Sequence, residues 1–380
     1  MSPQFRRAMV EHSPEFFLTY YLGFKLPEHQ RRWIKLWKIK YLLDLAPRDH
    51  GKSWIFSYGH PLYEIYNDFV KRNLEEVRVR FLQISKTDDQ SAKYANQVKT
   101  TIEKNPFLLE DFGVIQDTDN WLKGYFSCKR KDTVLNIEKD HTYEKTGVLG
   151  GITGGHFEFI NVDDPLDDEN TKTADRMNAI ENWFWGTVWN LREPYTRIRV
   201  VGTRKNRRDL FNTLIQSPLW RKNIEKAIIK YPMISDPHDH TKTMQGWLYV
   251  TESGRHVRGL QDLRADETIV DVELLTDDYE VLWPSADAVD DTGEMINEPI
   301  IDQRTGDEIG QRPKVFGWGI KELLMDRAGQ GATSFDREKQ NEISAEEGAI
   351  WHKDWFHFFS NEELFLNDQD GHYYLQPEAA

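Results

Sequence analysis

The sequence predicts an α/β protein in which helices cover a mainly parallel sheet, and three observations support this fold class. Short apolar runs typical of strands alternate with segments of helical periodicity. A loop containing glycine, Ala46–Ser53, connects the first of these runs to a helical segment. Polar residues gather where the predicted strands end, which is the edge where open parallel sheets place their ligands.

The composition is that of a globular protein. Of the 380 residues, 39% are hydrophobic, 13% are aromatic and 29% are charged, which suits one large domain or two ordinary ones. The single cysteine, Cys128, excludes a disulfide framework and a cysteine-based metal site, and it fits a reducing cytosol. No apolar run approaches the roughly 20 residues of a membrane-spanning helix, and the first residues lack the apolar core of a signal peptide.

Charge is unevenly distributed along a chain whose formal net charge is −14. Residues 196–230 contain ten lysines and arginines against two acids, whereas residues 231–310 contain five against nineteen. A locally basic surface can contact a polyanion even on an acidic protein. The alternative is that both stretches are simply solvated faces.

Capping residues and periodicity predict the elements in order. In the first part of the chain we expect helices at 13–21 and from 27, a strand at 41–45, a helix from 54, a strand at 77–85 and a helix at 87–104. Next come strands at 133–137, 157–162, 197–201 and 224–231, a glycine-rich loop at 147–155, and helices at 168–185 and 209–216. For the acidic remainder, 232–341, we expect loops with a β-hairpin near 295–310 and a helix near 319–328.

The loop Ala46–Ser53 predicts a phosphate-binding site. Its last three residues match the end of the pattern G-x-x-x-x-G-K-[ST], and Ala46 stands in place of the first glycine. Gly51 allows the backbone to approach a phosphate closely, Lys52 brings a positive charge to it, and the Ser53 hydroxyl can ligate Mg²⁺. The alternative is an ordinary β-turn with a solvated lysine.

A pair of acids ends the strand predicted at 157–162. Apolar residues lead into Asp163-Asp164, the pattern of a Walker B motif. Asp163 can hold Mg²⁺, and Asp164 can orient the attacking water or take its proton. Alone, the pair is better explained as an acidic strand-to-turn junction. The upstream phosphate loop favours the catalytic interpretation, because neighbouring strands of a parallel sheet end side by side.

Three further side chains are candidates for the same site. Thr203 ends the next predicted strand and can sense a γ-phosphate, or it can cap a helix. Arg48, inside the loop, can stabilise charge on the transferring phosphoryl group, or it can pair with an acid. Gln30 can hydrogen-bond an adenine edge, or it can be a surface residue. The histidines show no metal-ligand spacing, so the sequence does not predict a zinc site.

These motifs and their order resemble the ATPase domain of a large terminase subunit, the DNA-packaging motor of tailed phages. The resemblance covers about residues 25–360. It rests on an adenine motif, a deviant Walker A motif, a Walker B motif, a coupling motif and two segments before the family's nuclease domain: Leu26–Gln30, Ala46–Ser53, Phe159–Pro165, Val200–Arg204 with Asp209-Leu210, Val281–Pro284 and Phe335–Asn341. The family often has glutamate where this chain has Asp164. Gly150–Gly155 contains no arginine where related motors often carry a trans-acting one.

The resemblance implies a P-loop NTPase fold of the ASCE type, with a central mainly parallel sheet flanked by helices and a small irregular lid or linker subdomain. It implies an N-terminal helical extension, an ATPase core, an acidic lid or linker subdomain, and the start of a linker to a nuclease domain that this chain lacks, at residues 1–25, 26–232, 233–345 and 346–380. Endonuclease activity is therefore not expected from this chain alone.

The resemblance also implies ATP and Mg²⁺ as cofactors and a role for each site residue. ATP would be bound by Gln30, Ala46, Pro47, Arg48, Asp49, His50, Gly51, Lys52 and Ser53. The metal ligands would be Ser53 and Asp163, and the catalytic residues Asp164, Arg48 and Thr203.

The implied partners are double-stranded DNA, a portal protein, a small terminase subunit and further copies of the chain in a ring of five, without a membrane. The implied location is the host cytoplasm, transiently on the procapsid and not in the mature virion. The competing functions are another phosphate-loop enzyme, such as a helicase or a small-molecule kinase, and a non-catalytic docking module of the packaging complex.

Overall fold

The computed structural model describes residues 1–122, 124–130, 140–152, 155–237, 239–283, 297–302, 305–313, 317–343, 364–366 and 373–375. The chain divides into two compact units, Met1–Ile343 and Ser344–Ala380. In the second unit the described residues form one antiparallel pair, β18 (Leu364–Leu366) with β19 (Tyr373–Leu375). All elements named below belong to the first unit.

An eight-stranded sheet, in the order β3-β4-β5-β2-β6-β7-β1-β8, is the centre of the first unit. Its strands are β1 (Tyr41–Leu45), β2 (Phe81–Ser85), β3 (Gln116–Trp121), β4 (Tyr125–Cys128), β5 (Tyr143–Gly147), β6 (Phe157–Asp163), β7 (Arg192–Gly202) and β8 (Arg221–Ile224). All neighbours from β5 to β8 are parallel, and β3 and β4 are antiparallel at one edge. The mainly parallel sheet confirms the predicted fold class. β7 lies between β1 and β6, which agrees with the ASCE type.

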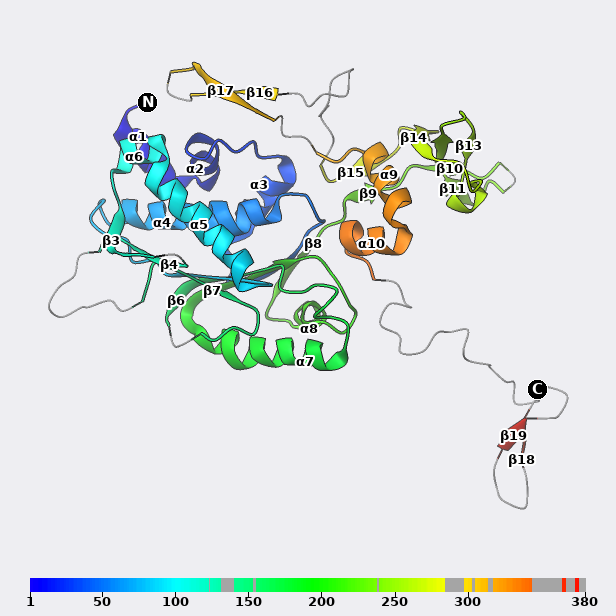
Figure 1. Ribbon diagram of the computed structural model, residues 1–380, viewed down its shortest axis with the longest axis horizontal. Helices are drawn as coiled ribbons and strands as arrows, with labels where there is room; N and C mark the ends of the chain where they lie inside the picture. The colour runs from blue at the N-terminus through cyan, green and yellow to red at the C-terminus, as the bar shows by residue number, and fades with distance from the viewer. Residues whose placement is uncertain are drawn as a thin grey trace. The chain divides into compact units, whose positions relative to one another are not determined.

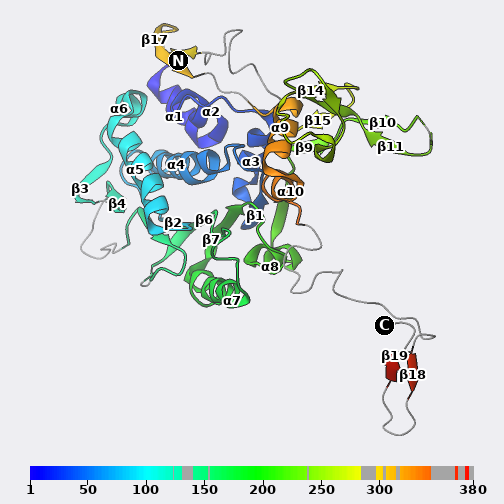
Figure 2. The ribbon, with the colours of Figure 1, turned by 45° about the vertical axis from the view of Figure 1, so that its right-hand side comes forward.

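Helices cover both faces of the sheet, as Figures 1 and 2 show. One face carries α1 (Pro3–His12), α2 (Pro14–Tyr20), α3 (Glu28–Lys35), α4 (His60–Lys71), α5 (Asp88–Lys104) and α6 (Pro106–Phe112). The other carries α7 (Ala174–Trp183) and α8 (Leu210–Gln216). Side chains alternate between the faces, so Leu42 packs in the first apolar cluster and Leu43 in the second. The sheet is therefore buried on both sides, as parallel sheets usually are.

Short irregular turns extend three of these helices. A 3₁₀ turn, η1 (Leu36–Lys38), follows α3, and a π-helical turn, η2 (Trp54–Gly59), precedes α4. A second π-helical turn, η3 (Phe184–Val188), and a 3₁₀ turn, η4 (Trp189–Leu191), continue α7 up to β7. The turn η2 begins directly after the predicted phosphate loop, and π-helical turns are often found at functional sites.

Most predicted elements are confirmed, and the differences have local causes. The helix predicted from residue 168 begins at Ala174, because the Thr173 side chain caps it by accepting from the backbone of Arg176. The strand predicted at 77–85 is confined to β2. The single strand predicted at 224–231 is wrong: β8 ends at Ile224 in the main sheet, and β9 (Ile228–Lys230) pairs elsewhere. The strand predicted at 133–137 lies outside the described residues, as do residues 153 and 154 of the glycine-rich loop.

A third apolar cluster is formed by described residues between Ala227 and Phe335, in a part of the chain where the sequence predicted mainly loops. Short antiparallel strands supply one side of it: β9 with β15 (Glu280–Val281), and β12 (Trp247–Thr251) with β13 (His256–Val257) and β14 (Ile269–Leu274). A short turn, η5 (Leu260–Asp262), connects β13 to β14, and β10 (Met233–Ser235) pairs with β11 (Thr243–Gln245). The predicted hairpin is confirmed as β16 (Asn297–Ile301) with β17 (Glu308–Pro313).

Two helices complete this part of the chain. The predicted helix near 319–328 is confirmed as α9 (Ile320–Gln330), and α10 (Ala332–Gln340) follows it after a single residue. Leu323 and Leu324 of α9 and Phe335 of α10 are fully buried in the third cluster. The strands here have two to six residues, too short to give a clear alternating pattern in the sequence. The domain boundaries predicted at residues 25, 232 and 345 stay predictions.

Candidate nucleotide-binding site

The loop Ala46–Ser53 connects β1 to η2 and has a tightly constrained backbone. Asp49 and Gly51 have left-handed conformations, with φ of +66° and +82°. A Cβ atom on Gly51 would lie 2.4 Å from the side-chain nitrogen of Gln30. Gly51 is therefore required by its backbone angle and also by the close approach of the Gln30 amide.

Lys52 and Thr203 meet across the ends of two neighbouring strands. The Lys52 ammonium donates a 2.9 Å hydrogen bond to the Thr203 hydroxyl, and the two residues are 7% and 2% exposed. β1 and β7 are parallel with Leu45 opposite Gly202, so their following residues start from the same edge. Thr203 does not cap the next helix, because the cap of α8 is Asp209.

Asp163 ends β6 and is completely buried. Its Oδ2 accepts a 2.8 Å hydrogen bond from the Ser57 hydroxyl, and the nearby Ser53 also favours the ionised carboxylate. Burial first, and then the charge of Asp164, raise the pKa of Asp163 to about 6, against the opposing effect of the two serines. Oδ1 has no hydrogen-bond partner among the described residues. An unpaired carboxylate oxygen beside a serine hydroxyl is a donor set that suits Mg²⁺, so the predicted ligands fit this ion.

Asp164 occupies the turn directly after β6. Its φ is +50°, a left-handed conformation that aspartate tolerates better than most residues. The backbone N–H donates to the oxygen of Val201 at 2.8 Å, which ties the turn to β7. The side-chain Oδ1 is buried and has no protein partner in the described part of the chain. One oxygen of the second acid is thus available to a bound water.

A cavity of about 770 Å³ lies beside the loop. Polar and loop residues line one part of it: Gly23, Lys25, Gln30, Arg48, Asp49, Gly51, Lys52 and Ser53. Apolar and aromatic side chains line the other part: Leu22, Phe24, Trp54, Tyr58 and Trp283. Gln30 is 6% exposed and donates to the backbone oxygen of His50 at 3.2 Å, so it is not a free surface residue. The volume and the aromatic lining suit a nucleotide base.

Arg48 belongs to the loop and is one of the residues that line this cavity. Its side chain is 64% exposed, and a guanidinium nitrogen lies 3.8 Å from a carboxylate oxygen of Glu338. Its backbone N–H donates to the backbone oxygen of Glu338 at 3.0 Å. In this structure Arg48 therefore pairs with an acid, the alternative that the sequence left open beside the catalytic role.

The sequence indicated no individual role for residues 338–341, yet they contact both the loop and the end of β7. Lys339 contacts the loop through Asp49. The Asn341 amide nitrogen donates to the backbone oxygens of Leu45, at 3.1 Å, and Glu225, at 2.8 Å. Its oxygen accepts from the backbone N–H of Arg204 at 3.2 Å. The resemblance had singled out this segment, but only the fold shows what it touches.

Tyr94, on α5, is a second residue that the sequence analysis missed. Its hydroxyl lies beside Ser53 and Asp163, the two predicted metal ligands, and both influence its pKa. Burial, assisted by the charge of Asp163, raises the pKa of Tyr94 to about 12, so the phenol is neutral at physiological pH. A tyrosine in a helix has many apolar uses, and nothing in the sequence distinguishes this one.

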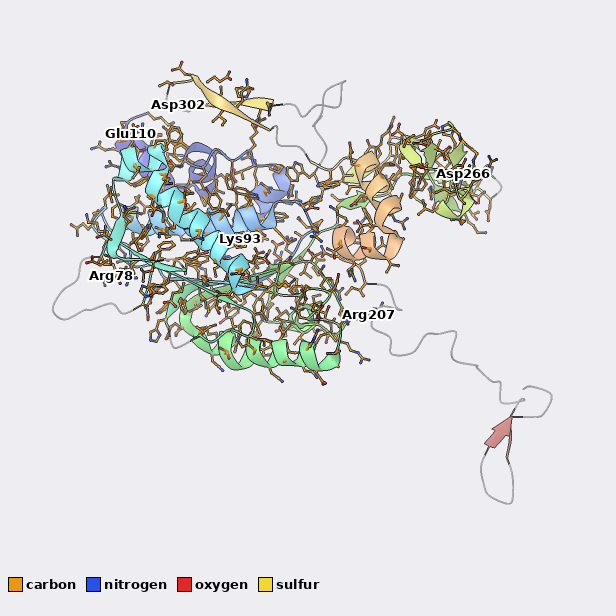
Figure 3. The ribbon with its side chains drawn as sticks, viewed as in Figure 1. Arg78, Lys93, Glu110, Arg207, Asp266 and Asp302 are labelled. Atoms are coloured by element: carbon orange, nitrogen blue, oxygen red, sulfur yellow. The ribbon has the colours of Figure 1, made fainter. Side chains whose placement is uncertain are left out.

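The basic stretch 196–230 does not form a single face. Arg199 is fully buried in β7. Three lysines form ion pairs with acids: Lys205, Lys226 and Lys230. Arg207, labelled in Figure 3, donates to the backbone just after α10. The exposed basic residues of the stretch include Arg208, Arg221 and Lys222.

Other classes of site have no support in the described part of the chain. No group of three or more histidine, cysteine, aspartate or glutamate side chains there is arranged to hold a metal ion. Among those residues, no helix combines the length and apolar character that crossing a membrane requires. Cys128 is buried, and burial raises the pKa of its thiol to about 12, which makes it a poor nucleophile.

Comparisons with known proteins found a likeness in structure to phage large terminases. No family model and no curated protein matches the sequence. The large terminase of bacteriophage HK97 is similar in structure at 14% identity with a TM-score of 0.35, over 59% of this chain and 44% of that one. Two structures of the large terminase ATPase domain of Thermus phage P74-26 match at 16% and 13% identity with TM-scores of 0.34 and 0.32. Each match covers 57% of this chain and 86% of the Thermus phage domain. The chain thus spans less than half the length of the HK97 enzyme that it matches.

Proposed function

We propose that the chain hydrolyses ATP with Mg²⁺ and that this reaction drives double-stranded DNA into a procapsid, as in a large terminase. One observation carries the ATPase proposal. β6, β7 and β1 are three adjacent parallel strands that end at one edge. The Asp163-Asp164 pair lies at the end of β6, Thr203 follows β7, and Lys52 lies in the loop after β1 and bonds Thr203. A positive charge, a hydroxyl and two acids around one position is the set that phosphoryl transfer to water needs.

The proposed division of labour follows from the contacts. The backbone of Ala46–Ser53 and the Lys52 ammonium bind the phosphates. Asp164 orients the attacking water and takes its proton at the carboxylate oxygen that has no protein partner. Ser53 and Asp163 would hold Mg²⁺, which neutralises charge on the phosphates when it is bound. The remaining predicted loop contacts, Pro47, Asp49 and His50, shape the backbone around these groups.

In this proposal, Thr203 and the γ-phosphate compete for the Lys52 ammonium. The Lys52 ammonium that it binds at 2.9 Å is the same group that would bind the γ-phosphate. A phosphate that attracts the lysine weakens this bond, so the end of β7 responds to whether ATP is present. In the proposed motor this response links hydrolysis to movement. Arg48 stabilises the transferring phosphoryl group only after it leaves Glu338.

The test is phosphate release from ATP and Mg²⁺, measured with and without double-stranded DNA. We expect Lys52→Ala to abolish release, and Asp164→Asn to bind nucleotide but release no phosphate. Unchanged release by Lys52→Ala would overturn the ATPase proposal. Transfer of phosphate to a small acceptor, independent of DNA, would indicate a kinase instead. Packaging by the Lys52→Ala variant would indicate a docking module.

Contact with DNA is proposed to be electrostatic, because a motor must grip the backbone independently of base sequence. Arg208, Arg221 and Lys222 are the exposed basic residues from which we expect this contact. DNA binding should weaken steeply between 50 and 300 mM salt, and a flat response would contradict an electrostatic grip. The further proposed partners are a portal protein, a small terminase subunit and other copies of the chain in a ring of five. The proposed location is the host cytoplasm, on the procapsid during packaging.

A further inference from the structure

A group of polar side chains is buried beneath the predicted metal site. Ser57 from η2, Gln83 from β2, and Asn161 and Asp163 from β6 are all 0% exposed. Central strands of a parallel sheet are normally apolar, and a buried polar group is costly unless it is hydrogen-bonded. A fully buried cluster of four polar side chains therefore requires a structural or functional explanation.

The hydrogen bonds of the cluster determine the direction of one proton. The Ser57 hydroxyl accepts from the Asn161 amide at 3.0 Å and from the Gln83 amide at 3.3 Å. Both amides are donors here, and a hydroxyl has a single proton to give. That proton is therefore directed to Oδ2 of Asp163, at 2.8 Å.

The spacing of two serines in the sequence places Ser57 where it can donate to Asp163. Ser57 lies four residues after Ser53, so both serines are on one face of the helical segment that follows the loop. Ser57 hydrogen-bonds Oδ2 of Asp163, and Ser53 also favours the ionised form of this carboxylate. Ser57 reaches the carboxylate from the buried side, and Oδ1 is the oxygen without a partner among the described residues.

We propose that Ser57 is a positioning residue for the metal-binding acid. It holds Oδ2 of Asp163 so that Oδ1 is presented to Mg²⁺ together with the Ser53 hydroxyl, and Gln83 and Asn161 hold Ser57 in turn. The inference rests on the proposed Mg²⁺–nucleotide site and adds the groups that orient it. Such supporting residues commonly change metal affinity by about 10- to 100-fold when they are removed.

Ser57→Ala removes this support with little other damage. The Gln83 amide nitrogen still donates to the backbone oxygen of Ile84 at 3.2 Å, and that of Asn161 still donates to the Gln83 oxygen at 2.8 Å. The loss therefore falls on Oδ2 of Asp163. The matched control is Ser91→Ala, because Ser91 is also a fully buried helical serine but bonds only the local backbone oxygen of Asp88 in the described structure.

The experiment measures the affinity of a fluorescent ADP analogue in EDTA and over a Mg²⁺ titration. We expect Ser57→Ala to bind as tightly as wild type in EDTA but to need about tenfold more Mg²⁺ for half of the metal-dependent gain, with Ser91→Ala unchanged. Equal Mg²⁺ requirements in wild type and Ser57→Ala would overturn the inference. So would an equal loss of affinity with and without Mg²⁺, which indicates a structural role alone.

One further variant and one further comparison separate the role of Ser57 from unfolding and from failure of the proposed function. Should Ser57→Ala unfold, Ser57→Cys keeps the side-chain shape but donates weakly, and the same shift in Mg²⁺ requirement is expected. Wild-type protein that binds no nucleotide in either condition would refute the proposed function itself, and the positioning role with it. Nucleotide binding that Mg²⁺ strengthens equally in all variants refutes only the role of Ser57.

Discussion

The Lys339 ammonium lies 3.0 Å from a carboxylate oxygen of Asp49, a residue 290 positions earlier in the chain. It also lies 3.3 Å from the backbone oxygen of Arg48 and 3.8 Å from the centre of the Trp318 ring. Lys339 is 2% exposed. Asp49 has a left-handed backbone, a conformation that costs most residues with a side chain about 1–2 kcal/mol and aspartate less. A helix from the far end of the first unit therefore holds the strained part of the phosphate loop.

We predict that Lys339→Met weakens nucleotide binding by about tenfold while the protein stays folded. Methionine keeps the apolar contact with Trp318, so the loss of stability should be small. Asp49 is half exposed, so no buried charge is left behind. The loop, however, loses the cation that compensates for its strain, equivalent to about 1.4 kcal/mol for a tenfold effect. Titration with the fluorescent ADP analogue measures the change.

Lys226→Met is the matched control for that substitution. Lys226 pairs with Glu342 near the same segment, but its side chain is 48% exposed, and exposed pairs contribute little. Its nucleotide affinity should equal that of wild type. A loss of affinity in both variants would show that any disturbance of this segment matters and that the loop contact of Lys339 is not special.

The sequence predicted that residues at strand ends would meet at one edge, because parallel strands bring consecutive motifs there regardless of the distance between them in the chain. Lys52, Thr203 and Asp163 follow this rule. It could not predict Lys339 or Asn341, because their contacts depend on how residues 227–343 fold back onto the loop. Nor could it predict the positioning role proposed for Ser57, because that role depends on polar partners on two strands, β2 and β6. Short-range patterns indicate which strand a residue ends, not which buried group it faces.

The prediction of the fold from short-range sequence patterns has the same limit. The stretch from Ile224 to Tyr231 was predicted as one strand because apolar residues recur along it between Glu225, Lys226 and Lys230. The chain instead leaves the main sheet at Glu225, whose backbone N–H still bonds Leu45, and then joins the third apolar cluster. Hydrophobicity alone does not distinguish one continuous strand from two short strands in different sheets.

We predict that Gly51→Ala reduces nucleotide affinity by more than tenfold. The added Cβ would lie 2.4 Å from the Gln30 amide, on a backbone with φ of +82°, so either Gln30 or the loop must move. Gly254→Ala is the matched control, with φ of +76° and no atom within 4 Å of its Cβ. Both variants should lose about 1–2 kcal/mol of stability, and only Gly51→Ala should lose affinity. Equal affinities would show that the loop tolerates the displacement.

We predict that Thr203→Val separates nucleotide binding from hydrolysis. Valine has nearly the shape of threonine, so the buried end of β7 is kept, but the Lys52 ammonium loses its partner at 2.9 Å. Affinity for an ATP analogue should change by less than about threefold, whereas phosphate release should fall by more than about tenfold, as for the loss of an interaction needed in the transition state. Thr251→Val, at a buried site in β12, should leave both measurements unchanged. Normal release by Thr203→Val would exclude the sensing role.

His60 gives a prediction about pH that does not depend on the nucleotide site. The imidazole is fully buried between Trp37, Phe81 and Phe159. Burial first, and then the charge of Arg199, lower its pKa to about 3. In the unfolded chain the value is about 6.5. As pH falls below about 6.5 the unfolded state therefore takes up a proton that the folded state does not, and stability is lost between about pH 6.5 and 3.

We predict that His60 alone lowers the free energy of unfolding by about 1.4 kcal/mol between pH 7.5 and pH 5.5. His29 and His50, whose pKa values are lowered to about 4 and about 3 by burial, should add to the loss. His60→Gln keeps an amide donor for Glu64 but has no proton to gain, so its unfolding free energy should depend less on pH by that amount. His12→Gln, at an exposed position ending α1, should behave as wild type. Denaturant titrations at the two pH values measure the difference, and an unchanged dependence in His60→Gln would mean that His60 does not remain neutral in the folded protein over this range.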